Sequence, residues 1–179
     1  TATLRLIAGF LEPNSGKVLL KGEDITGVPP YKRPVNTVFQ KYALFPHLNV
    51  FENVAFGLRL KKMDEETIRR KVRDMLEVVG LKGFERRSIG QMSGGQQQRV
   101  AIARALVNNP STIVADEPTG NLDPARSLEI MTLLERINAL GTTVIVVTHE
   151  RGLVNRFNKR IILLHEGRVI GDGMGSYEV

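Results

Sequence analysis

Apolar and polar residues alternate along the chain with two different periods, which predict strands and helices in succession. Short apolar runs at 111–115 and 142–148 predict strands. The second run is almost entirely β-branched, which is typical of a strand buried on both faces. Apolar residues spaced for one face of a helix occur at 64–79, and a second helix is expected over 122–141. This alternation favours an α/β domain with a mostly parallel sheet.

Residues that favour helix starts and helix ends occur at the boundaries of the two expected helices. Asp64 and Asp123 are candidate N-caps, and Pro124 would occupy the first helical position after Asp123. Gly80 and Gly141 follow the expected helix ends.

Weaker signals predict further short elements. They are a helix over 4–8 that ends at Gly9, a hairpin within 16–25, a β-prone run at 37–39, and two strands within 160–173 around a turn at Glu166-Gly167.

Composition narrows the class of protein. The 179 residues include no cysteine, which excludes a disulfide framework and thiolate metal sites and suits a reducing cytosol. No apolar run approaches the ~20 residues of a membrane span, and no secretory signal is recognisable. The formal charge of +6 fits a solvated basic surface, a site for anionic ligands, or a face near a membrane.

Acidic and polar residues follow the expected strands. Asp116 and Glu117 come directly after the run at 111–115, and a parallel sheet would place them at its carboxyl edge, where ligands of such folds bind. One carboxylate could hold Mg²⁺ while the next orients or deprotonates water. His149 and Gln40 also follow β-prone runs. Taken singly, each of these residues is more typical of an ordinary strand end or a surface position.

The stretch "SGGQQQR" at 93–99 opens a helix with a hydroxyl residue and two glycines. Backbone N–H groups at a helix N-terminus bind anions, and glycine allows close approach of the backbone. An ordinary turn and N-cap is the alternative reading.

Four motifs occur in order, namely "SGGQQQR" at 93–99, "VADEP" at 114–118, "NLDP" at 121–124 and "TH" at 148–149. Together they resemble the nucleotide-binding subunit of ATP-binding cassette (ABC) transporters, over essentially the whole chain. The resemblance implies an α/β, P-loop NTPase-like ABC ATPase core with a parallel sheet and an inserted helical lobe. The core lobe would comprise 1–40 and 110–179, and the helical lobe about 41–109.

The resemblance also implies roles for individual residues, with ATP and Mg²⁺ as cofactors. Asp116 matches the metal-binding acid, Glu117 the catalytic glutamate, and His149 the switch histidine that contacts the γ-phosphate. Gln40 matches a glutamine that senses both the metal and the attacking water. Ser93, Gly94, Gly95 and Gln96 match the signature aimed at the ATP of the other subunit, and Asn121, Leu122 and Asp123 match the loop that crosses the dimer seam.

The phosphate-binding loop G-x-x-x-x-G-K-[ST] is not among the 179 residues. Aligning Arg5 and the "LIAG" that follows puts Thr1 at the last position of that motif, whose hydroxyl binds Mg²⁺. We therefore expect the loop and the N-terminal strands to be missing, and the chain to be inactive alone.

Residues 1–109 resemble the ATPase of bacterial polyamine importers, and residues 110–179 resemble the ATPase of the cell-division ABC complex. The expected function is ATP hydrolysis that energises a membrane permease, with a second ABC subunit as partner and no nucleic acid. The location would be cytoplasmic, peripheral on the inner face of the bacterial membrane. Alternatives are a non-catalytic permease-binding fragment or recombined ABC fold, and a soluble ABC ATPase acting on nucleic acid or ribosomes.

The segment 42–54 carries four large side chains within ten residues, Tyr42, Phe45, Leu48 and Phe51. They are either core residues of the helical lobe or a groove for a short permease helix.

Overall fold

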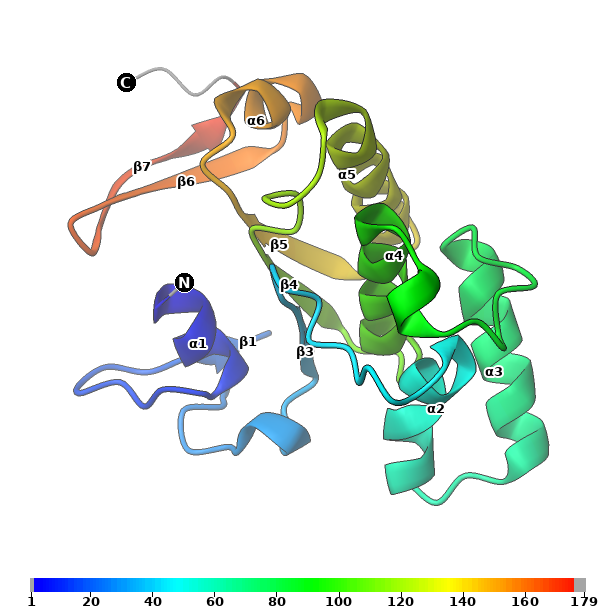
Figure 1. Ribbon diagram of the computed structural model, residues 1–179. Helices are drawn as coiled ribbons and strands as arrows, with labels where there is room; N and C mark the ends of the chain where they lie inside the picture. Colours follow the sequence, from blue (N-terminus) through cyan, green and yellow to red (C-terminus); the bar gives the residue numbers. More distant parts are fainter. Residues whose placement is uncertain (1, 176–179) are drawn as a thin grey trace. The chain divides into compact units, whose positions relative to one another are not determined.

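The computed structural model describes residues 2–175, which form two compact units (Figure 1). The first unit runs to Val147 and the second begins at Thr148. Within residues 2–175 there is no helix with both the length and the apolar character needed to cross a membrane.

Three parallel strands form the sheet of the first unit, in the order β3 (Val35–Val38), β4 (Thr112–Asp116) and β5 (Thr143–Val147). Ala115 of β4 is paired with Val38 of β3, and Asp116 with Val147 of β5. The carboxyl ends of all three strands therefore meet at one edge, and the predicted α/β class with a parallel sheet is confirmed.

Helices connect the strands, as parallel pairing requires. Between β3 and β4 the chain forms α2 (Val50–Leu60), α3 (Glu65–Val78) and α4 (Gly94–Leu106), and between β4 and β5 it forms α5 (Pro124–Ala139). The remaining elements of this unit are α1 (Ala2–Ala8), the antiparallel pair β1 (Leu19–Leu20) and β2 (Glu23–Asp24), and short 3₁₀ helices at Pro30–Lys32 and Ile89–Gln91.

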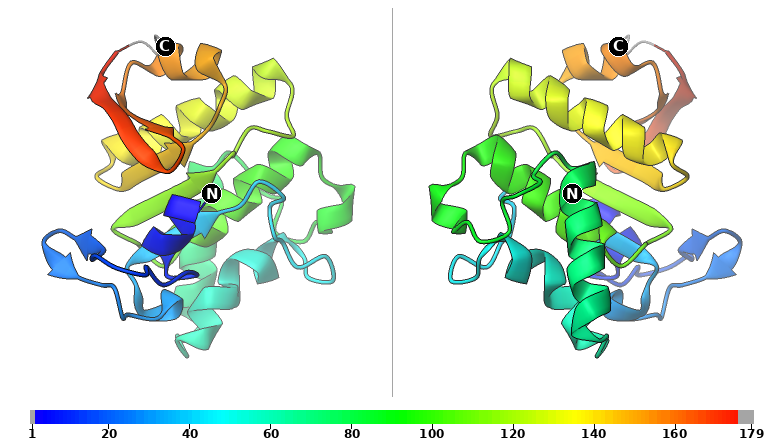
Figure 2. Two further views of the ribbon diagram at one scale, coloured as in Figure 1. Left: turned by 90° about the vertical axis from the view of Figure 1, so that its left-hand side faces the viewer. Right: turned by 90° about the vertical axis from the view of Figure 1, so that its right-hand side faces the viewer.

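The sheet buries both of its faces against helices. Ile113 and Ala115 of β4 join the core formed with α4 and α5, whereas Val114 between them packs with Leu4 of α1 on the opposite face. Figures 1 and 2 show α1 on one side of the sheet, with α4 and α5 on the other. Successive side chains of a strand point to opposite faces, so an uninterrupted apolar strand is needed to fill both cores.

The last strand of this sheet is less buried than its sequence predicts. Thr143 is exposed, and Val144 to Val147 are half-buried. Val144 and Val146 pack against one core and Ile145 and Val147 against the other, so both faces of β5 are covered as predicted. Burial is only partial because, among the described residues, β5 lies at the edge of the sheet with β4 as its neighbour. The β-branched run predicted the strand correctly but not its place in the sheet.

The predicted helix caps are confirmed. Asp64 Oδ1 accepts a hydrogen bond from the Thr67 N–H at 2.9 Å, and Asp123 Oδ1 accepts one from the Arg126 N–H at 3.0 Å. The glycine after each of these helices adopts a left-handed φ, which a residue with a side chain adopts only with strain.

Buried Arg33 fixes the C-terminal end of α1. Its guanidinium donates to the carbonyls of Leu6 and Ile7 at 2.8 and 2.9 Å, and it donates to Val28 at 2.7 Å from the loop that follows β2. A Cβ at Gly9 would lie 2.7 Å from the Arg33 Nε, so this position requires glycine.

The second unit contains α6 (Arg151–Phe157) and an antiparallel hairpin of β6 (Arg160–His165) and β7 (Arg168–Met174). Glu166 and Gly167 form its turn with φ values of +46° and +76°, as predicted. Asp172 of β7 accepts two hydrogen bonds from Arg160 of β6, at 2.7 and 2.6 Å. The division into a core lobe and a helical lobe over 41–109 stays a prediction.

Candidate functional site

The carboxyl edge of the sheet carries the two acids that the sequence singles out. Asp116 ends β4, and Glu117 follows it with a φ of +47°. Holding a residue with a Cβ in this left-handed region costs about 1–3 kcal/mol of conformational free energy, so the surrounding structure must impose the conformation. The Glu117 N–H donates to the Val147 carbonyl at 2.9 Å, and its Oε2 is buried.

Residues 116–123, here named the edge turn, fold back towards Gln40. Leu122 and Gly120 each donate a backbone hydrogen bond inside the turn, at 2.9 and 3.1 Å. Asn121 Nδ2 donates to the Gln40 carbonyl at 3.0 Å. A Cβ on Gly120 would lie 2.8 Å from the Gln40 Nε2, so glycine makes room for that side chain. The structure therefore brings predicted Gln40 beside the turn that carries Glu117.

The donor set at this edge suits Mg²⁺, which prefers oxygen ligands and keeps several water or phosphate ligands. Half-buried Asp116 and the amide oxygen of Gln40 are the candidate protein ligands. Residues 2–175 contain no cluster of three or more His, Cys, Asp or Glu side chains that could bind a metal ion without other ligands. Such a site fits a metal held largely by phosphate oxygens.

The predicted helix at the signature is α4, and Ser93 is its N-cap. Ser93 Oγ accepts from the Gln96 N–H at 3.3 Å, and Gln96 Oε1 accepts from the Ser93 N–H at 3.0 Å. This reciprocal pair leaves the N–H groups of Gly94 and Gly95 without partners inside the helix. Those two groups form the exposed positive end of the helix dipole.

Close packing within the chain gives the two signature glycines a second reason to be glycine. A Cβ on Gly94 would lie 2.9 Å from the Tyr42 Oη, and one on Gly95 would lie 3.1 Å from the Arg126 Cδ. Side chains at both positions would push Tyr42 and Arg126 away from the start of α4. Glycine at both positions thus allows this close packing within the chain itself.

Asp123 has a local role that is already visible. It caps α5 and forms an ion pair with Arg126. The hydrogen bond from the Arg126 N–H, helped by the Arg126 guanidinium, holds the pKa of Asp123 below its usual value. If Asp123 also takes part in nucleotide binding, as predicted, its carboxylate would have to do so while it caps α5.

The segment after Gln40 contains two consecutive left-handed residues, Tyr42 and Ala43, with φ of +59° and +49°. Arg104 of α4 donates to both of their carbonyls, at 3.2 and 2.8 Å. Burial lowers the pKa of the Arg104 guanidinium and raises the pKa of the Tyr42 hydroxyl. A strained backbone is therefore held by a side chain from 62 residues further along the chain.

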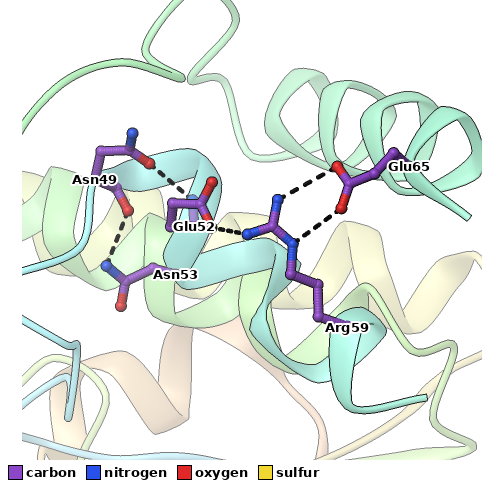
Figure 3. Close-up of polar contacts among 5 residues, drawn as sticks. All are labelled: Asn49, Glu52, Asn53, Arg59 and Glu65. Atoms are coloured by element: carbon purple, nitrogen blue, oxygen red, sulfur yellow. Dashed lines mark hydrogen bonds and ion pairs between the residues drawn. The ribbon is translucent and has the colours of Figure 1, made fainter. Parts of the chain in front are cut away.

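Buried Asn53 holds the next part of the segment (Figure 3). Its Nδ2 donates to the carbonyls of Phe45, Leu48 and Asn49 at 3.0–3.2 Å, and its Oδ1 accepts from the Phe45 N–H at 2.8 Å. Arg59 pairs with Glu52 on α2 and with Glu65 at the start of α3, as Figure 3 shows. These contacts fix residues 45–49 against α2.

The large side chains of 42–54 are neither fully buried nor fully exposed. Tyr42, Phe45, Leu48 and Phe51 are half-buried, whereas Ala43 and His47 are exposed. The Phe45 ring lies 4.7 Å from the ring of Phe56, which is 40% exposed. Beside this surface is a groove of about 790 Å³, lined by Asn49, Phe51, Arg69, Arg73, Gly83, Glu85 and Arg86.

For two predicted site residues, His149 and Thr1, the role stays a prediction. His149 belongs to the second unit, so its approach to the edge turn stays a prediction. Thr1 lies outside the described residues.

Sequence reasoning missed several residues that organise the site. Arg104, Asn53 and Gln98 each bind a backbone carbonyl in a functional segment. Their signal in the sequence is faint, since each is a polar residue within an otherwise apolar helix face.

Comparison with known proteins identifies the family. The sequence profile of the ABC transporter family matches residues 1–120. The chain belongs to the ABC transporter family.

Its relatives include importer ATPases. The chain is 50% identical over 170 residues to the spermidine/putrescine import ATP-binding protein PotA of Clostridioides difficile (strain 630), covering 94% of this chain and 49% of that protein. It is 51% identical over 180 residues to PotA of Desulfitobacterium hafniense (strain Y51), covering 99% and 52%. The chain therefore spans about half the length of the curated relatives it matches.

Solved structures agree with the fold. The dimeric post-hydrolysis state of the ATP-binding cassette MJ0796, bound to ADP and Pi, superposes with a TM-score of 0.82 at 36% identity, covering 97% of this chain and 79% of that one. The cbiO1 protein from Clostridium perfringens, part of the cbiONQ transporter complex, superposes with a TM-score of 0.87 at 34% identity, covering 96% and 71%. The helices and the parallel sheet of this chain are thus those of an ABC ATPase.

Proposed function

We propose that the chain is the ATP-binding and ATP-hydrolysing part of an ABC importer, and that the edge turn carries the hydrolysis. The observation that supports this most directly is Glu117, an acid held in a left-handed conformation at the end of β4, next to Asp116 and beside Gln40. Backbone strain of this kind is concentrated at functional sites.

Each residue at the edge would have a separate task. Glu117 would accept the proton of the attacking water, and Gln40 would orient that water. Asp116 and Gln40 would hold Mg²⁺, with the Thr1 hydroxyl as a further ligand. The ion, when bound, neutralises the developing charge on the phosphates. His149 would contact the γ-phosphate, as the resemblance to the family implies.

The capped start of α4 would serve the nucleotide of a second ABC subunit. The Gly94 and Gly95 N–H groups and the Ser93 hydroxyl are donors for a terminal phosphate. Gln96 supports Ser93 through the capping box. Asn121, Leu122 and Asp123 would run along the seam between the two subunits.

A membrane permease would contact the segment 42–54. Exposed Ala43 and His47 lie beside the half-buried aromatic surface of Phe45. The adjoining groove has three arginines and one glutamate in its lining, so a permease segment with an acidic side chain would fit it best. The protein would then act at the inner face of the bacterial membrane. The non-catalytic permease-binding fragment is the alternative, and the same surface would serve it.

Polyamines are the proposed cargo. The import ATP-binding proteins that are 50–51% identical to this chain over the aligned residues are named for spermidine and putrescine. Direct uptake of labelled spermidine and putrescine by the reconstituted complex would test the cargo separately from ATP hydrolysis.

Residues 1–179 by themselves should bind Mg-ATP only weakly, because no G-x-x-x-x-G-K-[ST] loop occurs among them. Calorimetry with the purified 179-residue chain would test this prediction. Micromolar binding with steady phosphate release would contradict it.

The test of the hydrolytic assignment is Glu117→Gln, in the protein that joins this chain to its phosphate-binding loop. Steady phosphate release should fall by ~10²–10⁴-fold, the range for a lost general base, while Mg-ATP still binds. Glu77→Gln is the matched control, because Glu77 lies on α3 and pairs with Lys82. Near-normal release by the Glu117 variant would reject the assignment.

The test of the permease contact uses single cysteines, which are unambiguous because the chain has none of its own. In the assembled complex, a cysteine at Ala43 or His47 should be linked to the permease by a reagent that joins a thiol to a nearby amine. Ala139→Cys, at the exposed end of α5, is the control and should not cross-link. Equal cross-linking at all three sites, or none at the first two, would exclude this docking surface.

A further inference from the structure

Gln98 lies on α4, one helical turn after Gly94, and its side chain is completely buried. A buried glutamine is unusual, because each amide atom then needs a partner within the protein. Its Nε2 donates to the Pro118 carbonyl at 2.6 Å. Pro118 is the residue directly after Glu117, so this bond ties the signature helix to the edge turn of the same chain.

The other amide atom, Gln98 Oε1, is buried and has no hydrogen-bond partner among residues 2–175. The reverse orientation of the amide would place this oxygen against the Pro118 carbonyl oxygen, so the observed orientation is the favourable one. A buried acceptor that lacks a partner costs free energy, and an apolar side chain of the same length would avoid that cost. Stability alone therefore gives little reason for glutamine at this position.

The bond from Gln98 to Pro118 lies next to a residue with an unfavourable backbone conformation. Proline disfavours helical conformations in the residue before it and pushes that residue towards extended ones. Glu117, directly before Pro118, instead has a φ of +47°. Two independent preferences thus oppose the observed conformation of Glu117. The bonds on either side of it offset them: the Glu117 N–H donates to Val147, the Glu117 carbonyl accepts from Gly120, and the Pro118 carbonyl accepts from Gln98.

We propose that Gln98 is a positioning residue for hydrolysis, which holds the Glu117 carboxylate in place by anchoring the Pro118 carbonyl to α4. This inference rests on the proposed role of Glu117. It also gives α4 two tasks, since the start of the helix faces the partner's nucleotide while Gln98 sets the base for the chain's own nucleotide.

The first test is Gln98→Met, in the full-length ATPase assembled with its partners. Methionine fills the same volume but cannot donate to Pro118. We expect kcat for ATP to fall ~10–10²-fold, the effect of misplacing a reacting group by about 1 Å. KM for ATP should stay within about twofold, because substrate binding is not the step affected. The Tm should be unchanged or higher, since the buried oxygen without a partner is removed.

Asn36→Leu is the matched control. Asn36 Nδ2 also donates to a backbone carbonyl of α4, Ala105, at the same distance of 2.6 Å, but far along the helix from the edge turn. This variant should lower Tm and leave kcat unchanged below the unfolding transition. A Gln98 variant that lowers Tm but not kcat would show a structural role only and overturn the proposal.

Gln98→Glu supplies a second readout that a structural role would not produce. An ionised carboxylate repels the Pro118 carbonyl, whereas the protonated acid can donate its O–H to it. Burial raises the pKa of such a carboxyl, so protonation becomes favourable as pH falls. The ratio of the variant's kcat to that of the wild type should therefore rise as pH is lowered, and the same ratio for Gln98→Met should stay flat.

The two proposals fail in different ways. If the wild-type complex hydrolyses ATP and the Gln98→Met kcat equals that of the wild type, the positioning role is wrong and the proposed function stands. If the wild-type complex releases no phosphate with Mg-ATP, the proposed function fails and this inference fails with it. A flat kcat ratio for Gln98→Glu across pH would also contradict the positioning role.

Discussion

The helix bundle of α2, α3 and α4 and the edge turn at residues 116–123 are held together in different ways. Each bundle helix begins at a cap that binds a backbone N–H three residues further on, from Asn49, Asp64 and Ser93. The edge turn has two backbone hydrogen bonds of its own, but it is also tied to Gln40 and Gln98, which are distant in the sequence. Local contacts and a packed core stabilise the bundle, whereas long-range contacts impose a strained conformation on the turn.

Backbone conformation follows the same division. Within α2, α3 and α4 no residue has a positive φ, and the left-handed residues of this part of the chain follow helix ends or lie in loops. Glu117 in the edge turn and the pair Tyr42–Ala43 are also left-handed without being glycine, but unlike Lys62 and Asn109 they do not follow the end of a helix. The well-packed bundle thus offsets the free-energy cost of the strained backbone at the edge.

The largest expected effect on stability comes from removing part of the bundle core. Leu58 of α2 is completely buried, and Leu58→Ala should lower the free energy of unfolding by about 2–5 kcal/mol. Urea denaturation measures this change. Turnover below the unfolding transition should remain that of the wild type. A large loss of turnover in fully folded protein would show that bundle and edge are not separable.

A substitution in the edge turn should have the reverse effect of Leu58→Ala, lowering turnover but hardly changing stability. Gly120→Ala places a methyl group 2.8 Å from the present position of Gln40 Nε2, the mobile end of a side chain. Gln40 must move, so we expect turnover to fall by about 10-fold or more with little change in Tm. Both kcat and Tm should be measured on the same preparation of the variant. Unchanged kcat would mean that the Gln40 side chain is not needed where it lies.

The smallest effect is the pH dependence of a bundle cap. The hydrogen bond from the Thr67 N–H lowers the pKa of Asp64 from its ordinary value of 3.8. A lowered pKa in the folded state stabilises the protein above the unfolded-state pKa, and this contribution is lost as pH falls through the folded-state value. Asn also caps helices but carries no charge.

Asp64→Asn should therefore have a slightly lower Tm than the wild type near pH 6, and the difference should close as the pH falls below about 3.8. Thermal scans of both proteins from pH 6 to about pH 2 measure this difference. A constant difference across that range would show that the charge of Asp64 does not support α3.

The elements that the sequence predicted well are those with local signals. Asp64 and Asp123 marked the starts of α3 and α5 because a cap bonds to a residue only three positions away. The strands β4 and β5 followed from uninterrupted apolar runs. The acids after β4 could be placed at the carboxyl edge because parallel strands end together.

What could not be predicted depends on distant partners. The exposure of β5 depends on its place at the edge of the sheet, which its own residues do not encode. The helix α2 was not predicted, since aromatic and β-branched residues obscure the period of "VFENVAFGLRL". The left-handed Glu117 contradicts the local preference of a residue before proline.

Bonds across the site are equally invisible in the sequence. Arg104 reaches Tyr42 across 62 positions, and Gln98 reaches Pro118 across 20. Such bonds become apparent only when the helices are packed.

Native-state hydrogen exchange in increasing denaturant tests the division between bundle and edge most directly. Amides of α4 such as Val100 and Ala103, which are buried in the core, should exchange only through global unfolding. The Gly120 and Leu122 amides, bonded within the edge turn, should exchange at least ~10²-fold faster and with little dependence on denaturant, because the turn opens locally. Exchange of both groups at one rate, with the same dependence on denaturant, would contradict the account.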